Sequence, residues 1–177
     1  VAARDRGLRV EDDLARFRLL RVRLASGRQA RDLFDLLPDD SEPEPNYPVY
    51  VPDLPETENV RGIAAFGSKA VEWLDTPGDR SNWGKGVLVA VLDTGVDFTH
   101  PALEGVKGTN LNLMEDETEE TSYDGHGTAV ASIIAGNSEV IGGLAPMAEI
   151  LSVQVLNSEG VGDGCTVAKG IIEAVDR

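Results

Sequence analysis

The chain has 177 residues, of which 41% are hydrophobic, and a formal net charge of −15. This apolar content is sufficient for a packed core and excludes wholesale disorder, and the length suits one domain or a small domain plus part of a larger one. The negative charge argues against nucleic acid or an anionic membrane as a partner, and we expect neither. Cys165 is the only cysteine, which excludes an intrachain disulfide, and we expect it to be buried packing rather than a nucleophile.

The first third of the chain predicts a small α+β module. Residues 17–24 (FRLLRVRL) alternate between apolar and charged and predict a half-buried strand. Residues 28–37 have apolar residues at helical spacing and predict a short helix that Pro38 ends. Residues 46–51 (NYPVYV) predict an edge strand because they contain proline, and residues 52–59 have the composition of an exposed linker.

The remainder predicts an α/β domain with a doubly wound, mostly parallel sheet. Residues 64–74 predict a helix, followed by a loop over residues 76–86. Residues 87–92 are a continuous apolar run, which is typical of a parallel strand covered on both faces, and residues 150–156 (ILSVQVL) predict another buried strand. Residues 128–135 and 167–175 predict helices. Strands that alternate with helices in this order indicate the doubly wound architecture.

Two residues at the ends of these elements suggest catalytic chemistry. Asp93 ends the first apolar run and begins a D-T-G turn, at the edge where parallel sheets place their ligands. His126 lies between two glycines where a helix begins, so we expect its ring to face outward. An aspartate that orients a histidine, which in turn takes a proton from a nucleophile, is an arrangement for nucleophilic hydrolysis. An isolated Asp-Thr-Gly is equally typical of a capped turn, and His100, before a proline, is expected to be structural.

The segments VAVLDTGVD, HP-x-L, DGHGT-x-VAS and G-x-APMAEILSVQVL resemble the first two thirds of a subtilisin-like serine protease domain, from about residue 83 onward. The resemblance implies that Asp93 is the orienting acid and His126 the general base. The third motif of the family, a serine in a segment of the G-T-S-M-A type, does not occur in this sequence, nor does the segment with the oxyanion-hole asparagine. We therefore expect a serine endopeptidase precursor fragment that is inactive until a carboxyl-terminal part of the catalytic domain is supplied.

The resemblance also implies a site for extended peptide substrates. Gly160, Val161 and Gly162 match the family's edge segment, where a substrate strand adds by backbone hydrogen bonds; glycines here are also consistent with a plain turn. Relatives often bind calcium through an aspartate after the His-Pro pair, where this chain has Ala102. We therefore expect no cofactor and no calcium at the usual family site. The acidic run over residues 115–120 is more typical of a solvated surface than of a metal site.

Residues 18–47, which end in Glu44-Pro45-Asn46-Tyr47, resemble the second half of a subtilisin propeptide. In the family this module assists folding and places its end in the active-site cleft as an inhibitor. The expected organisation is therefore a propeptide-like module over residues 1–51, a linker over 52–60, and the amino-terminal portion of the catalytic domain over 61–177. No signal peptide occurs at residue 1, but a propeptide implies export, and we expect a secreted protein.

Two other interpretations remain open from the sequence. Asp93-Thr94-Gly95 also matches the aspartic-protease triplet, which predicts an all-β chain acting as a dimer. A non-catalytic module that binds peptides along Gly160–Gly162 fits a chain without a nucleophile. In a truncated doubly wound sheet, strands left without neighbours would expose apolar faces. We therefore expect the isolated chain to self-associate, to be partly molten, or to have lost a partner segment.

Overall fold

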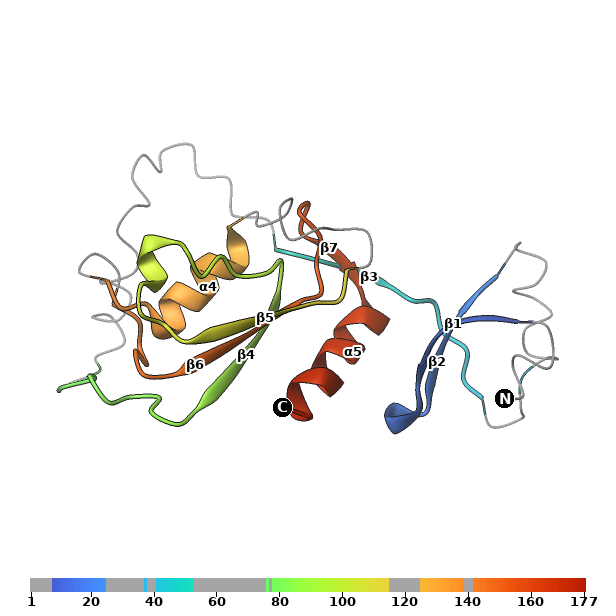
Figure 1. The fold of residues 1–177 in the computed structure, drawn as a ribbon. Helices are drawn as coiled ribbons and strands as arrows, with labels where there is room; N and C mark the ends of the chain where they lie inside the picture. Colours follow the sequence, from blue (N-terminus) through green and yellow to red (C-terminus); the bar gives the residue numbers. More distant parts are fainter. Residues whose placement is uncertain are drawn as a thin grey trace. The chain divides into compact units, whose positions relative to one another are not determined.

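The computed structural model describes residues 8–24, 37, 41–52, 76, 78–114, 125–138 and 142–177. The chain divides into two compact units, Val1–Tyr47 and Pro48–Arg177, each of which is described by itself (Figure 1). Within the described residues, no helix has the length and apolar character needed to span a bilayer. The predicted helices over 28–37 (apart from Leu37) and 64–74, the linker beyond Pro52 and the acidic run over 115–120 lie outside the described residues.

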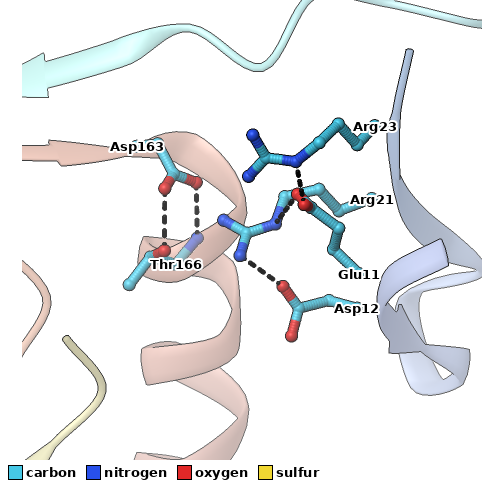
Figure 2. Close-up of polar contacts among 6 residues, drawn as sticks. All are labelled: Glu11, Asp12, Arg21, Arg23, Asp163 and Thr166. Carbon is cyan, nitrogen blue, oxygen red and sulfur yellow. Dashed lines mark hydrogen bonds and ion pairs between the residues drawn. The ribbon is translucent and has the colours of Figure 1, made fainter. Parts of the chain in front are cut away.

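The first unit contains an antiparallel hairpin of β1 (Arg9–Leu14) and β2 (Leu19–Arg23), joined by the 3-10 turn η1 (Ala15–Phe17). Strand β2 confirms the strand predicted over residues 17–24, although Leu20 is 43% exposed. Strand β1 is absent from the sequence prediction because its residues, RVEDDL, do not alternate. Figure 2 shows its acidic side chains paired with arginines of β2: Arg21 Nη2 lies 2.8 Å from Asp12 Oδ2, and Arg23 Nε donates to Glu11. The hydrogen bond from Arg23 lowers the pKa of the Glu11 carboxyl below its ordinary value.

The second unit is built on a parallel sheet with the strand order β4–β6–β5 (Figure 1). Its strands are β4 (Leu88–Asp93), β5 (Gly108–Asn112) and β6 (Glu149–Gln154). Because successive side chains of β6 point to opposite faces, Ile150 joins the core cluster of helix α4 (His126–Ala135), whereas Leu151 and Val153 join that of helix α5 (Gly164–Val175). The sheet is therefore covered on both faces by helices, as the predicted α/β fold requires.

The two strands that the sequence predicts to be buried differ in how deeply they are buried. The central strand β6 is buried from Ile150 to Gln154, and Val155 and Leu156 continue this run beyond its end, which confirms the prediction for residues 150–156. The prediction that residues 87–92 are covered on both faces is wrong for the beginning of β4, where Leu88 is 46% exposed and Ala90 is also exposed. The beginning of β4 is more exposed because β4 lies at an edge, with only one neighbour among the described strands of this sheet.

Both helices begin earlier than the sequence pattern predicts. Helix α4 begins at His126, two residues before the predicted start, and α5 begins at Gly164, three residues before it. Asp163 causes the early start of α5, because its Oδ1 accepts from the Thr166 amide at 3.0 Å and its Oδ2 from the Thr166 hydroxyl at 2.9 Å (Figure 2). Such a cap satisfies an amide at the start of a helix that has no partner within the helix.

A separate two-stranded sheet pairs β3 (Pro48–Tyr50) with β7 (Val161–Asp163) in antiparallel orientation. Pro48 lies opposite Asp163, Val49 opposite Gly162, and Tyr50 opposite Val161. Strand β3 confirms the edge strand predicted over residues 46–51. The segment before the predicted linker thus contributes a strand to the second unit.

The Asp163 cap gives a stability prediction. We expect Asp163→Ala to lower the free energy of unfolding by about 1 kcal/mol, because the Thr166 amide loses its acceptor. Asp163→Asn keeps an oxygen acceptor and should cost clearly less. Urea denaturation of both variants measures the difference, and equal losses would show that the cap does not stabilise α5.

Candidate active site

The structure brings Asp93 and His126 together. Asp93 is the last residue of β4 and lies in register with Gln154 at the carboxyl end of the parallel sheet. His126 is the first residue of α4, where the preceding Gly125 adopts a left-handed conformation (φ 92°). The predicted strand end and the predicted helix start therefore meet at one edge of the sheet, as the parallel arrangement requires.

The His126 ring contacts the Asp93 carboxylate through one nitrogen. Nδ1 lies 2.8 Å from Oδ1 and 2.9 Å from Oδ2 of Asp93. Because an ionised carboxylate only accepts hydrogen bonds, Nδ1 carries the proton in this contact, and in the neutral ring Nε2 then has the lone pair. The Asp93 side chain is 11% exposed and that of His126 is 38% exposed. A buried acid thus orients a ring that solvent or a substrate can reach.

The backbone around Asp93 fixes the position of its carboxylate. The amide of Thr94 donates to Asp93 Oδ1 at 2.7 Å. The Asp93 carbonyl accepts from the amides of Val155 at 2.9 Å and Leu156 at 3.2 Å, which ties the end of β4 to the chain that continues from β6. The side chain and the main chain of Asp93 are therefore both anchored, and the acid is preorganised for the histidine.

Gly127 permits the close approach of α4 to the turn after Asp93. A Cβ atom at residue 127 would lie 2.2 Å from the Gly95 carbonyl oxygen and 3.3 Å from Asp93 Cβ. Gly95 itself has a φ of 98°, a conformation that favours glycine. Both glycines of the sequence motifs thus serve the contact between the acid and the histidine.

The predicted substrate edge forms strand β7 and the turn before it. Gly160 has a φ of 73°, and its carbonyl accepts from the Val51 amide at 2.9 Å. Asn157, which the sequence analysis did not single out, shapes the turn, because its Oδ1 accepts from the amides of Glu159 at 3.0 Å and Val161 at 2.8 Å. An Asn that opens a glycine turn is the signal that could have identified it.

Three further residues with basic or nucleophilic side chains lie away from this contact. His100 Nδ1 accepts from the Ala102 amide at 3.2 Å, which caps the short turn η2 (Pro101–Leu103). Cys165 is buried. Ser132 donates its hydroxyl to the Ala129 carbonyl within α4 at 2.7 Å. Among the described residues, no three His, Cys, Asp or Glu side chains gather as a metal ion would require.

An α/β sheet that holds an aspartate against the Nδ1 of a helix-starting histidine has the acid and base arrangement of serine proteases. The helices α4 and α5 are inconsistent with the all-β chain of the aspartic-protease interpretation. The model of the Subtilase family matches residues 84–177, just over half of the chain. The chain therefore belongs to the subtilase family of subtilisin-like serine proteases.

Individual relatives agree with this assignment. The chain is 37% identical over 97 residues to thermitase from Thermoactinomyces vulgaris, an alignment that covers 53% of this chain and 35% of thermitase. It is 35% identical over 137 residues to an intracellular serine protease from Paenibacillus polymyxa, which covers 74% of this chain and 40% of that protein. The structure of fervidolysin from Fervidobacterium pennivorans, a keratinolytic enzyme related to subtilisin, has a TM-score of 0.65 and 25% identity, covering 99% of this chain and 32% of fervidolysin. The chain thus spans between a third and two fifths of the length of these curated relatives.

The close approach at Gly127 predicts a large loss of stability on substitution. Gly127→Ala should lower the free energy of unfolding by about 3 kcal/mol, because the added methyl group meets a backbone oxygen that cannot move independently of the turn. Gly142→Ala is the matched control, since a Cβ there meets no atom within 4 Å, and it should change stability by less than about 0.5 kcal/mol. Chemical denaturation compares the two, and similar values would contradict the proposed packing.

Proposed function

We propose that this chain carries the acid and the general base of a serine endopeptidase, and that it becomes active when a further segment supplies the serine and the oxyanion-hole donor. The observation that supports this most directly is the Asp93 carboxylate at 2.8 and 2.9 Å from His126 Nδ1. The resemblance of both motifs to the subtilase pattern supports the same assignment. By itself, the chain is proposed to be inactive.

In the proposed mechanism, the Nδ1 proton of His126 stays in its hydrogen bond to Asp93 throughout. The free Nε2 takes the proton from the serine hydroxyl as its oxygen attacks the scissile carbonyl carbon, and the imidazolium that forms is stabilised by the adjacent carboxylate. Nε2 then returns the proton to the leaving amine. The exposed side of the ring is where the serine has to approach.

We further propose that Gly160, Val161 and Gly162 bind extended peptide or protein substrates. Strand β3 supports this role because it pairs with β7 in antiparallel orientation, as an added substrate strand would. The Val51 amide also donates to the Gly160 carbonyl. Val49 and Val51 pack against the core cluster of Leu151, Val153, Val155 and Leu156, whereas Tyr50 is 62% exposed. Alternate residues of a bound strand therefore contact the protein, which favours substrates with aliphatic residues at alternate positions.

The organisation proposed for the precursor follows from this pairing. Residues 1–51 act as a propeptide-like module whose end, β3, occupies the substrate edge as an inhibitor, residues 52–60 form the linker that is processed, and residues 61–177 begin the catalytic domain. A propeptide of this kind fits an exported protein. Export stays a prediction, since relatives include a protein described as an intracellular serine protease.

A non-catalytic peptide-binding module is the second candidate. The pairing of β3 with β7 favours it, because this contact binds an extended strand without any nucleophile. The two candidates differ in whether the Asp93 and His126 pair ever takes part in hydrolysis.

Complementation distinguishes these candidates. Addition of the carboxyl-terminal part of a thermitase-like catalytic domain, which carries the serine, should restore cleavage of a peptide substrate, and phenylmethylsulfonyl fluoride should block it. Asp93→Ala and His126→Ala should each lower kcat by at least about 10⁴-fold. His100→Ala is the control and should retain cleavage. Peptide binding without any cleavage in the complemented protein would favour the binding module instead.

The proposed substrate edge predicts which positions of β3 matter. Val49→Asp and Val51→Asp place a charge against the apolar cluster and should release β3, so the exchange of amides in β7 should accelerate by about tenfold or more. Tyr50→Asp is the matched control, because its side chain is exposed, and it should leave the exchange nearly unchanged. Hydrogen exchange with mass-spectrometric detection measures this, and equal effects at all three positions would rule out the alternating contact.

A further inference from the structure

Two buried threonines connect the turn after Asp93 to the start of α4. Thr94, next to Asp93, accepts through Oγ1 from the Gly127 amide at 3.2 Å. Thr128, on α4, accepts through Oγ1 from the Asp97 amide at 3.0 Å. Thr94 is fully buried and Thr128 is 6% exposed. The two bonds run in opposite directions between the same two segments.

The Thr94 bond takes the place of an ordinary helix cap. The N-cap residue of α4 is Gly125, which makes no side-chain cap hydrogen bond. The amide of Gly127 would otherwise be one of the donors without a partner that every helix start presents. Its acceptor is Thr94, the residue after β4, so the start of α4 is capped by the residue that follows the proposed catalytic acid.

The residues that these bonds join are the immediate neighbours of the acid and the base. Thr94 follows Asp93 and Gly127 follows His126, so one bond fixes the separation of the two backbones beside the carboxylate and the ring. The Thr128 bond to Asp97 prevents the helix start from turning about that first contact. A shift of about 1 Å in such a pair is enough to weaken its hydrogen bond and its catalytic effect.

We infer that Thr94 and Thr128 are positioning residues, whose hydroxyl groups hold the His126 ring in its Nδ1–H tautomer against Asp93. This inference rests on the proposed function only for its catalytic meaning, because the tautomer itself is set by the described contacts. The two threonines act through their hydroxyl oxygens, which accept hydrogen bonds, and not through their volume. Valine has nearly the same shape as threonine but lacks this acceptor, whereas serine keeps it.

The two histidines of the chain provide a direct readout with an internal control. His126 Nδ1 faces a carboxylate and carries a proton, whereas His100 Nδ1 accepts from the Ala102 amide and carries none. The 177-residue chain labelled with ¹⁵N-histidine should therefore show opposite neutral tautomers in long-range ¹H–¹⁵N spectra: Nδ1–H for His126 and Nε2–H for His100.

Substitutions then test the role of the hydroxyls. Thr94→Val should lower the ratio of the Nδ1–H to the Nε2–H tautomer of His126 by about threefold to tenfold, as expected for the loss of one hydrogen bond, and Thr94→Ser should restore it. Thr128→Val and Thr128→Ser should behave in the same way. Thr166→Val is the matched control, because this buried threonine also begins a helix, but its hydroxyl donates to Asp163. It should leave both histidines unchanged.

Each outcome decides the inference. An unchanged His126 ratio in folded Thr94→Val and Thr128→Val chains would overturn it, as would a loss in the serine variants equal to that in the valine variants. If Thr94→Val does not fold, the Thr128 pair decides alone. Failure of the proposed function would appear elsewhere, as absence of cleavage in the complemented protein despite a correctly held tautomer.

Discussion

The contact between the Asp93 carboxylate and His126 Nδ1 is the interaction on which the rest of the described site depends. It joins residues 33 positions apart and connects the end of a strand to the start of a helix. A carboxylate that is 11% exposed and a helix start without its own side-chain cap would both be unfavourable alone. Brought together, each of these features is compensated by the other segment, so the geometry of the site and the stability of the fold are coupled.

Strand β6 makes this contact possible although it contributes no catalytic residue. It lies between β4 and β5 and is buried on both faces, with α4 and α5 packed on opposite sides of it. Parallel pairing with β4 places Asp93 level with Gln154, and the chain beyond β6 then binds the Asp93 carbonyl. The burial of β6 thus fixes where β4 ends, and through β4 it fixes the acid.

Sequence reasoning found Asp93 and His126 because each lies where one apolar run ends or begins and has a glycine nearby. It could not predict that Thr94 accepts from Gly127, since that bond exists only after β4 and α4 have met. It found β3 and the Gly160 turn as separate features, but their pairing depends on tertiary structure. It missed β1, whose charged residues are stabilised by arginines across the hairpin rather than by alternating burial. It also overestimated the burial of β4. An apolar sequence shows that a strand can be buried, but it does not show how many neighbouring strands it has.

Backbone groups connect Asp93 to strand β7, the edge proposed to bind peptides. The Asp93 carbonyl accepts from the Leu156 amide, Leu156 forms a bridge with Gly162, and Gly162 lies opposite Val49 of the added strand. Gly162 has to be glycine in this arrangement, because a Cβ there would lie 2.2 Å from the Val155 carbonyl oxygen. A strand bound at β7 therefore takes its register from the same backbone that holds the acid.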